Sequence, residues 1–425
     1  MARASIPAHD VADLALAPEG QARIAWAAGQ MPVLAQIRER FAADRPLEGM
    51  RIAACLHVTG ETANLVRTLA AGGATLGLCS ANPLSTQDDV AAALVLEDRV
   101  EVRARRGEDL DTYVEHVLAL LATHPQITLD DGADLLMTAH ARGGETLKGL
   151  IGGTEETTTG IVRLRRLEEE GGLRVPVLAV NEARTERALN DRHGTGQSAL
   201  DGIVRASNVL LAGNTIVIVG YGWAGQGVAE RARGAGGAVI VCEVDPLRAL
   251  EARMAGYEVT TALDAAARGD IFITVTGSRR VLRGEHFARM KDRALLANAG
   301  HFDVELDLTE LRELATRGVR AVRPLVDEYT MADGRRLNLL AHGRVVSLAA
   351  AEGHPAAVMD VSFALQALGV EELVRSQGRL AAGVHSVPAA VDREVGRLKL
   401  AALGVRIDEP TAEQEHYRES WGPPT

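Results

Sequence analysis

The sequence is poor in cysteine and contains no long uncharged apolar run. Its three cysteines, Cys55, Cys79 and Cys242, are scattered and lie in apolar stretches. An odd number at these spacings predicts buried thiols in a reducing compartment, not disulfides or a metal site. No segment reaches the roughly 18 uncharged apolar residues of a membrane helix, and residues 1–30 lack the pattern of a signal peptide. We therefore expect a cytoplasmic protein that uses no metal and contacts no membrane.

Positive charge and aromatic side chains are also scarce. The 46 lysines and arginines stand against 57 aspartates and glutamates, which gives a formal net charge of −11, and aromatic residues make up 3% of the chain. No basic cluster is interleaved with aromatics, so the features that nucleic-acid binding requires are missing. With 47% apolar and 24% charged residues over 425 positions, the composition is typical of a globular protein of two or three domains.

The sequence does contain a glycine-rich turn between two apolar runs. Residues 214–219 precede Gly220-Tyr221-Gly222-Trp223-Ala224-Gly225, a helical stretch follows, and the run 238–242 ends in Glu243. Strand, turn, helix, strand and acid in this order form a dinucleotide-binding unit. Gly220 permits the tight turn, Gly222 lets the backbone approach a pyrophosphate, and Gly225 lets helix and strand pack closely. The N-terminus of the helix then faces the phosphates.

The acid at the end of the second run indicates which dinucleotide is bound. Glu243 lies 18 residues after Gly225, near the spacing at which an acid binds a ribose 2′-hydroxyl. A carboxylate there repels a 2′-phosphate, so the pattern predicts NAD and not NADP. A glycine motif alone is weak, since many glycine turns bind no ligand. The two strands and the acid in register carry the prediction.

Apolar runs that alternate with amphipathic stretches predict a parallel sheet in the first part of the chain. We expect strands at 50–56, 74–79, 100–104, 127–129 and 177–180, and helices at 20–41, 62–71, 88–96 and 109–121. In such sheets, ligands bind beyond the carboxyl ends of the strands. His57, Ser80 and the pair Asp130-Asp131 fall at such ends, and they are therefore candidate site residues.

The second part of the chain predicts further strand–helix units around the glycine turn. A polar stretch, 181–196, and a helix, 198–211, precede the turn, and we expect later strands at 271–275, 294–297, 322–324 and 344–348. Gly353-His354-Pro355 then breaks the pattern before a helix at 359–368. The predicted fold class is α/β, with two doubly wound parallel-sheet domains joined by a hinge. A short, charged, helical C-terminal segment belongs to neither core.

Eight strings lie along the chain at 56–62, 85–88, 129–132, 155–160, 194–198, 220–223, 298–303 and 353–355. In this order they resemble one enzyme family, the adenosylhomocysteinases, which are NAD-dependent hydrolases of S-adenosylhomocysteine. The resemblance runs from about residue 10 to about residue 422. The ending, Tyr417 to Trp421 followed by four residues, is similar to the shorter archaeal and thermophile branch, which lacks the tail that other members lend to a neighbouring subunit's NAD. The strings are Leu56-His57-Val58-Thr59-Gly60-Glu61-Thr62, Ser85-Thr86-Gln87-Asp88, Leu129-Asp130-Asp131-Gly132, Glu155-Glu156-Thr157-Thr158-Thr159-Gly160, Gly194-Thr195-Gly196-Gln197-Ser198, Gly220-Tyr221-Gly222-Trp223, Asn298-Ala299-Gly300-His301-Phe302-Asp303 and Gly353-His354-Pro355.

The resemblance implies a redox-neutral reaction. In the family, tightly held NAD⁺ oxidises the ribose 3′-hydroxyl, and the resulting ketone acidifies the neighbouring C4′–H. A base removes that proton, and the 5′ substituent leaves as the C4′–C5′ alkene forms. Water then adds at C5′, and the hydride returns to C3′. NAD is therefore a catalyst and not a consumed substrate, and the substrate is an adenine nucleoside.

The resemblance also implies roles for individual residues and for the parts of the chain. His57 and Asp131 would move protons near C4′ and C5′, Glu156 would hold the sugar hydroxyls, and His301 with Phe302 would gate the pocket. Residues 1–185 would bind the substrate, together with a return of the chain at 353–385. Residues 186–352 would bind NAD, and 386–425 would join subunits into a homotetramer or homodimer. The other substrate-binding residues would be Thr59, Glu61, Gln87, His354 and Met359, and the cofactor-binding residues Thr157, Thr158, Thr159, Gly220, Gly222, Trp223, Ala224, Gly225, Glu243, Thr276 and Asn298.

Several of these residues also have ordinary structural explanations. His57 alone would be a hydrogen-bonding side chain at the end of a strand, and Asp131 a turn residue before Gly132. The threonine run would be a β-favouring edge or a helix cap, and His301 a loop residue without a gating role. Their order along the chain, in the family's arrangement, favours the functional interpretation.

The sequence departs from the family at the position of the redox chemistry. The ungapped match across 181–196 places Glu186 where the family has a lysine, Asn190 where it has an aspartate, and Asp191 where it has an asparagine. In the family, the lysine and the aspartate meet the 3′-hydroxyl, and the asparagine orients the lysine. A lysine presents a cation to a developing oxyanion, whereas a glutamate presents an anion. Losing one well-placed donor at such a site typically costs on the order of 3 kcal/mol.

This departure leaves two ways to compensate for the missing lysine and three candidate functions. Either Arg184, Arg187 or Arg192 supplies the missing cation, or Glu186 takes the hydroxyl proton itself as an already ionised base. The first function is a dehydratase, of the kind that forms angustmycin A (decoyinine) in a nucleoside-antibiotic pathway, which eliminates water and leaves an unsaturated sugar. The alternatives are an ordinary adenosylhomocysteinase and a catalytically inactive NAD-binding regulatory homologue.

Overall fold

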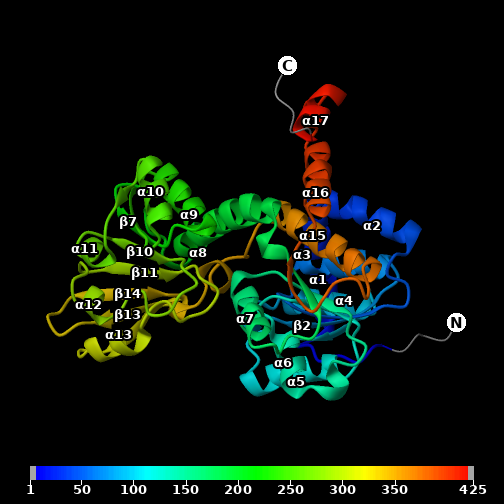
Figure 1. Cartoon of the computed structure of the whole chain (residues 1–425). Coiled ribbons are helices and arrows are strands. Elements are labelled where there is room, and N and C mark those ends of the chain that lie inside the picture. The colour runs from blue at the N-terminus through cyan, green and yellow to red at the C-terminus, as the bar shows by residue number, and fades with distance from the viewer. Residues whose placement is uncertain (1–5, 420–425) are drawn as a thin grey trace.

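The computed structural model describes residues 6–419 and contains two parallel-sheet units, which confirms the predicted α/β class. The first unit holds a seven-stranded sheet in the order β15-β6-β5-β4-β1-β2-β3, with every pair parallel. Helices cover both faces of this sheet (Figure 1). Its strands are β1 Arg51–Leu56, β2 Thr75–Ser80, β3 Glu101–Arg103, β4 Ile127–Asp130, β5 Gly152–Glu155, β6 Pro176–Ala179 and β15 Gly383–Ser386.

Strand β1 shows why this unit has two helical layers. It is buried on both faces, so successive side chains enter different cores. Ile52, Ala54 and Leu56 pack with one set of helices, and Ala53 and Cys55 pack with the other. The helices of the first set are α1 Ala17–Ala28, α2 Pro32–Asp44, α3 Gly60–Ala71, α4 Asp88–Leu96 and α15 Ala356–Arg375, and those beneath the other face are α5 Leu110–Leu121, α6 Asp134–Arg142 and α7 Thr158–Glu169.

The second unit holds an eight-stranded sheet in the order β12-β13-β14-β11-β10-β7-β8-β9. Six strands run parallel, and a hairpin adds two antiparallel strands at one edge. The strands are β7 Thr215–Val219, β8 Ala238–Cys242, β9 Glu258–Val259, β10 Ile271–Thr274, β11 Ala294–Asn298, β12 Val319–Arg323, β13 Val326–Thr330 and β14 Arg336–Leu340. The helices are α8 Gly196–Ser207, α9 Trp223–Gly234, α10 Pro246–Met254, α11 Ala262–Ala266, α12 Gly284–Phe287, α13 Leu308–Leu314 and α14 Val346–Ala349.

Some expected elements differ from the structure. The predicted strand at 344–348 is wrong, because residues 346–349 form α14 and only Val345 makes an isolated bridge, to Asn298. The strand expected at 322–324 lies in the antiparallel hairpin and not in a strand–helix unit. The helix expected at 20–41 is divided where Pro32 begins α2, and the one expected at 198–211 ends at Ser207, after which Asn208 is left-handed.

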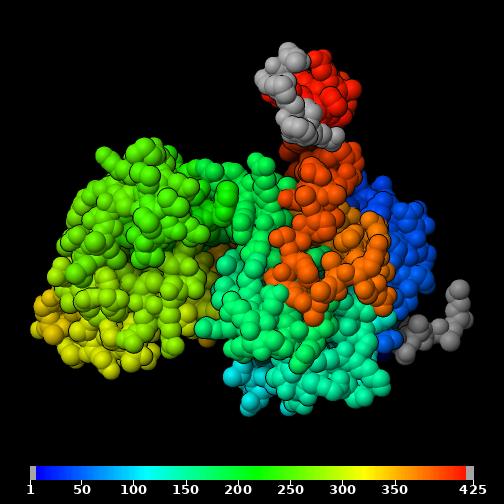
Figure 2. All heavy atoms as spheres, viewed as in Figure 1, coloured from blue at the N-terminus to red at the C-terminus, as the bar shows by residue number. Residues whose placement is uncertain are grey.

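The C-terminal segment is only partly separate from the first unit. Helix α16 (Ala389–Ala402) packs on α15 and α2, and Val395 is fully buried. The expectation that the whole tail belongs to neither core is therefore wrong for α16. Beyond it, α17 (Ala412–Glu419) stands away from the body (Figures 1 and 2). Ser420 to Thr425, which end the tail string, lie outside the described residues.

Among residues 6–419, no helix is both long and apolar enough to cross a membrane. The remaining short turns are η1 Leu14–Leu16, η2 Pro83–Ser85, η3 Gly144–Thr146, η4 Val180–Glu182 and η6 Ala341–Gly343, and the π-helix η5 spans Glu186–Thr195.

Candidate active site

A cavity of about 950 Å³ lies between the two units and is lined by residues from both. It collects the carboxyl-end loops of the two parallel sheets, which is where such folds bind ligands. Of the predicted site residues, Gln87, Phe302, Gly225 and Asn298 do not line it. Those that do are His57, Thr59, Glu61, Asp131, Glu156, Thr157, Thr158, Thr159, Glu186, Asn190, Asp191, Gly220, Gly222, Trp223, Ala224, Glu243, Thr276, His301, His354 and Met359.

The glycine turn between β7 and α9 forms one wall of the cavity. Gly220 has a φ of +105°, a left-handed conformation that favours glycine. Gly222 precedes the first turn of α9 with no side chain in the way, so the first amides of the helix are open to a ligand. Glu243 ends β8, and its carboxylate accepts hydrogen bonds from the amides of Tyr221 (2.7 Å) and Asp245 (3.0 Å). This cradle fits a dinucleotide pyrophosphate with a ribose beside Glu243.

Gly225 and Asn298 support this wall from behind. A Cβ at Gly225 would collide with the carbonyl of Gly220, so glycine is required for the helix to lie close to the turn. Asn298 is fully buried, and its amide nitrogen donates to the carbonyls of Gly300 (3.1 Å) and Phe302 (2.8 Å). Asn298 therefore fixes the loop that carries His301 toward the cavity.

The threonine run lies at the start of α7. Thr157 is the residue before the helix, and its amide donates to Glu155 Oε1 at 2.8 Å. Thr158 Oγ1 donates to Asn181 Oδ1 at 2.6 Å. Thr159 Oγ1 is buried and has no hydrogen-bond partner among the described residues, although Thr159 lines the cavity. A buried hydroxyl without a partner is costly, so this atom suits contact with a bound ligand.

His57 and Asp131 meet because β1 and β4 are neighbours in the first sheet. Their side chains follow directly after these strands, and His57 Nε2 lies 3.3 Å from Asp131 Oδ2. His57 Nδ1 is hydrogen-bonded to Ser85 Oγ at 2.7 Å. The sequence reasoning missed this partner, although Ser85 begins the string Ser85-Thr86-Gln87-Asp88. Burial lowers the pKa of His57 despite the opposing charge of Asp131. The imidazole is therefore neutral at neutral pH and able to accept a proton.

Glu156 lies at the end of β5, buried against α15. Ser362 Oγ donates to its Oε1 and Gln366 Nε2 donates to its Oε2. Burial is the main cause that raises the pKa of Glu156 to about 8, with a smaller contribution from the charge of Asp131. The sequence reasoning missed Ser362 and Gln366. Their signal was two polar residues, four apart, inside an otherwise apolar helix.

The three residues that depart from the family lie on η5, a π-helix whose wider turn sets their directions. Glu186 is 1% exposed, and its Oε1 accepts a hydrogen bond from Asn190 Nδ2. Asn190 Oδ1 in turn faces His354 Nδ1. Burial lowers the pKa of His354 to about 4, so this ring is neutral and its Nδ1–H donates to Asn190. The chain from His354 through Asn190 fixes the carboxyl of Glu186.

Both acids of η5 are held in a setting that disfavours charge. Burial, followed by the charges of Glu156 and Asp191, raises the pKa of Glu186 well above its ordinary value. Burial raises the pKa of Asp191 to about 6, opposed by a hydrogen bond from Asn181 and by the charge of Arg187. A low-dielectric site with like charges therefore opposes ionisation of Glu186, and its action as an already ionised base stays a prediction.

Two of the arginines expected to compensate for the missing lysine, Arg187 and Arg192, pair with other acids. The backbone amide of Arg184 donates to Asp392, Arg187 pairs with Glu182, and Arg192 pairs with Glu230. Arg187 does line the cavity, but its charge acts on Asp191. The ion pairs of Arg187 and Arg192 with Glu182 and Glu230 could not be inferred from their closeness to Glu186 in sequence.

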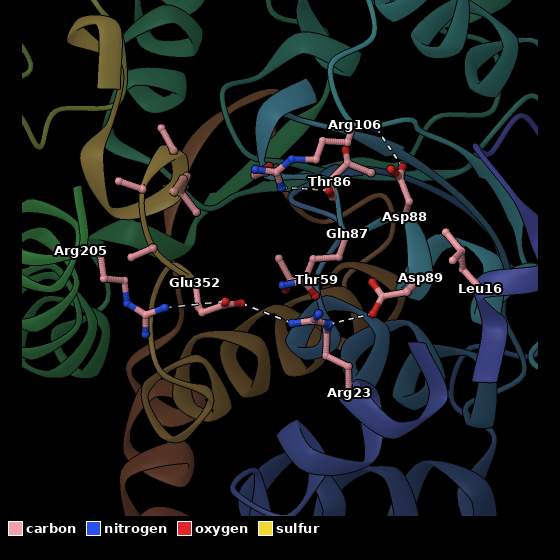
Figure 3. A pocket seen from close by; sticks show the side chains of 15 residues that line it. Leu16, Arg23, Thr59, Thr86, Gln87, Asp88, Asp89, Arg106, Arg205 and Glu352 are labelled. Atoms are coloured by element: carbon pink, nitrogen blue, oxygen red, sulfur yellow. Dashed lines mark hydrogen bonds and ion pairs between the residues drawn. The ribbon is translucent and has the colours of Figure 1, made fainter. Parts of the chain in front are cut away.

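A second cavity, of about 460 Å³, borders the first (Figure 3). Gln87 lines this cavity, and its Oε1 accepts a hydrogen bond from the Gly60 amide at 3.1 Å. Glu352 crosses between the units here, 3.3 Å from Arg23 and 3.9 Å from Arg205 (Figure 3). Thr59 lines both cavities, so Gln87 supports the main site from outside it.

His301 and Phe302, on the loop after β11, complete the description of the site. Phe302 is 41% exposed and packs edge-on against His301, with ring centroids 4.6 Å apart, and it does not line the cavity. His301 Nδ1 lies 4.0 Å from Asp131 Oδ1.

Over the part of the chain that the structure describes, no group of three or more His, Cys, Asp or Glu side chains is arranged to hold a metal ion.

Comparison with known proteins gives the same family over nearly the whole chain. The family model described as "S-adenosyl-L-homocysteine hydrolase, NAD binding domain" matches residues 191–353, and "S-adenosyl-L-homocysteine hydrolase" matches residues 8–146. The adenosylhomocysteinases of Thermosynechococcus vestitus and Aquifex aeolicus are 56% and 55% identical, each over 97% of this chain and over 96% and 98% of their own length. The S-inosyl-L-homocysteine hydrolase of Methanopyrus kandleri is 51% identical over 97% of both chains. Together with the NAD cradle and the paired His57 and Asp131, these similarities show that the chain belongs to the NAD-dependent adenosylhomocysteinase family.

Proposed function

We propose that the protein is an NAD-dependent enzyme that removes the 5′ substituent of an adenine nucleoside without net oxidation. The observation that carries this proposal is a shared cavity, in which the turn at Gly220 and Gly222 faces the pair His57 and Asp131. NAD⁺ bound at the turn supplies the oxidation of the sugar 3′-hydroxyl and the later return of the hydride. The side chains around the cavity perform the proton transfers.

His57 is suited to remove the proton from C4′ once C3′ is a ketone. Its neutral ring has a free electron pair, and Asp131 at 3.3 Å stabilises the imidazolium that forms. Asp131 gives a proton to the group that leaves from C5′. Glu156 holds the sugar hydroxyls, while Thr59 and Glu61 recognise the base at the other end of the cavity. His354 and Met359 complete this substrate wall.

The leaving group has two candidates, and different observations favour them. The names of the relatives support cleavage of a thioether, S-adenosylhomocysteine, into adenosine and homocysteine, and this is the function that the comparisons favour. The second candidate is elimination of water from a 5′-type hydroxymethyl group, which leaves an unsaturated-sugar nucleoside. One observation favours it: the buried position of the family's lysine carries Glu186, with no cation beside it.

Two measurements test these proposals. First, the absorbance of bound cofactor is followed after mixing with adenosine, inosine or S-adenosylhomocysteine, and transient reduction is expected. No reduction with any of them would remove the shared proposal and favour an inactive NAD-binding homologue. Second, thiol titration after addition of S-adenosylhomocysteine detects the hydrolase. Mass spectrometry of adenosine-type nucleosides in heavy-oxygen water separates it from net loss of water.

We also propose a division of labour along the chain. Residues 1–185 with 353–385 bind the nucleoside, 186–352 bind NAD, and 386–425 join subunits into a homotetramer or homodimer. The projection of α17 from the body (Figure 2) and the exposed Leu403 and Ile407 support the last point. Light scattering of the wild type and of the Leu403→Glu/Ile407→Glu variant tests it. A smaller assembly is expected for the variant, and an unchanged mass would count against this segment.

A further inference from the structure

Two buried carboxyls line the same cavity at the junction of the two units. Glu156 comes from the end of β5, and Glu186 comes from η5, which packs on α9 of the other unit. The hydroxyl of Ser362 on α15 donates to Glu156 and also lies close enough to Glu186 to influence its ionisation. Glu156 and Glu186 line the main cavity and are 8% and 1% exposed.

Among residues 6–419, the charged groups that act most strongly on this pair are acids. Its neighbours are Asp191 on η5, which is itself an acid, and Asp131 beyond Glu156. The nearest imidazole, His354, is neutral and reaches Glu186 only through the side chain of Asn190. Two carboxylates in a low-dielectric site repel each other, so ionisation of one carboxyl disfavours ionisation of the other.

The free oxygen of Glu186 indicates what the pair is for. Oε1 is occupied by Asn190, whereas Oε2 is buried and has no hydrogen-bond partner within residues 6–419. Three other acids of the cavity are engaged: Asp131 with His57, Asp191 with Asn181, and Glu243 with backbone amides. Glu186 differs from these three acids because one of its carboxyl oxygens has no hydrogen-bond partner among residues 6–419 and is available to a ligand.

We propose that Glu156 and Glu186 share one proton across Ser362, and that Glu186 in its unprotonated form removes the proton of the sugar hydroxyl that is oxidised. This inference rests on the proposed function, which supplies the hydride acceptor. The O–H bond of the 3′-hydroxyl breaks, and its proton joins Glu186 Oε2. The C3′–H bond breaks as hydride leaves with its electron pair, and the C3′=O bond forms. The same carboxyl returns the proton when the ketone is reduced, so the cycle balances.

The shared proton replaces what a cation would otherwise do. When Glu186 accepts the hydroxyl proton, the proton already present in the pair stays with Glu156, and no new buried charge is created. Asn190 keeps the acceptor oxygen oriented through Oε1. The arrangement thus takes a proton from the alcohol without a positive side chain at that position, as paired carboxyls do in other acid–base sites.

The test uses the full-length protein carrying its NAD and adenosine as the probe. Rapid mixing measures the rate at which bound cofactor is reduced. Glu186→Gln keeps the size and the contact to Asn190 but removes the base, so a loss of about 100-fold or more is expected. NAD content and adenosine binding are expected to be unchanged. Glu169→Gln, on the exposed end of α7, is the matched control and should behave as wild type.

A second pair of readouts separates a catalytic role from a structural one. In Glu156→Gln the like charge beside Glu186 is removed, so the decline of the reduction rate on acidification should move to lower pH. Infrared difference spectra of wild type minus Glu186→Gln should show the carbonyl band of a protonated carboxyl at neutral pH, without any substrate. If Glu186→Gln reduces its cofactor at the wild-type rate, or if Glu156→Gln leaves the pH profile in place, the shared-proton proposal is wrong while the proposed function stands. If wild type never reduces its NAD with adenosine, both fall together.

Discussion

The packing of α9 on η5 provides a test of how the site is positioned, because it can be disturbed without touching the cavity. Gly227 on α9 lies against the backbone of η5, and a Cβ at this position would be 1.7 Å from the carbonyl oxygen of Arg192. That atom belongs to the backbone and cannot rotate away. To reach an ordinary contact, the two helices would have to separate by roughly 1.5 to 2 Å. Gly227→Ala should therefore displace the segment that carries Glu186 and Asn190.

Two opposing effects set the expected size of the change in stability. Alanine is favoured over glycine in a helix by about 0.5 to 1 kcal/mol, and overpacking against backbone costs about 3 kcal/mol, at the upper end of the usual range. The net loss is about 2 kcal/mol in the free energy of unfolding. The loss of activity should be larger, because a misplacement of about 1 Å can lower a rate about 100-fold.

Gly234 provides the matched control on the same helix. It is the last residue of α9, and a Cβ there would meet nothing within 4 Å. Gly234→Ala should therefore raise the unfolding temperature slightly and leave activity unchanged. Thermal unfolding and the rate of NAD reduction with adenosine are measured for both variants. If Gly227→Ala proves as stable and as active as Gly234→Ala, the contact between α9 and η5 does not position the site, and our reasoning is refuted.

Four further outcomes are expected. Restoring the family pattern with Glu186→Lys, Asn190→Asp and Asp191→Asn should increase homocysteine release from S-adenosylhomocysteine relative to wild type, measured by thiol titration, and no change would argue against a retuned site. Thr159→Val should lower NAD affinity by about 1 kcal/mol, or roughly fivefold, in equilibrium binding without lowering the unfolding temperature of the cofactor-free protein, because its buried hydroxyl has no partner to lose. The pKa of Glu156 is raised to about 8, so the folded state binds this proton more tightly than the unfolded chain does. The corresponding stability is present in acid and lost as the pH rises through 8, and the unfolding temperature of wild type should fall more steeply between about pH 5 and 8 than that of Glu156→Gln; equal slopes would contradict it. Val395→Ala should lower the free energy of unfolding by about 1 to 3 kcal/mol in denaturant titrations, because Val395 is fully buried, whereas no loss would mean that α16 is not part of the core.

The sequence predicted many strands of the two sheets because buried strands leave a strong local signal, but it did not predict β5, β13, β14 or β15. The strands around His57, Asp131 and the glycine turn are short apolar runs bounded by polar loops, and β1, β4 and β7 lie where those runs predicted them. The strand expected at 344–348 is wrong, although the local sequence also favours a strand there. Val345 and Val346 have strand propensity, but the first makes only an isolated bridge and the second begins α14, packed on α8. Tertiary packing decided this segment, and no local pattern encodes it.

The ionisation of the site was beyond the reach of sequence for a different reason. The sequence alone shows that Glu186 stands where the family has a lysine, and three neighbouring arginines suggested a compensating charge. Whether an arginine compensates depends on where its side chain points, and Arg187 and Arg192 of η5 pair with Glu182 and Glu230. Burial and the charge of Glu156, which is 30 residues away in sequence, raise the pKa of Glu186 well above its ordinary value.

The same contacts explain how oxidation and elimination stay in register. Gly196 and Gly227 bring η5 and α9 together with no side chain between them, and Gly202 does the same for α8 and the backbone of Val346. These close approaches hold Glu186 on the unit that carries the dinucleotide turn, whereas His57, Asp131 and Glu156 belong to the other sheet. Any rotation between the units would therefore change the distance from Glu186 to Glu156 while leaving Glu186 fixed relative to the turn. Under the shared-proton proposal, the carboxyls share a proton only when the units are closely apposed, so the base for oxidation would become competent in the same geometry that brings the C4′ proton to His57.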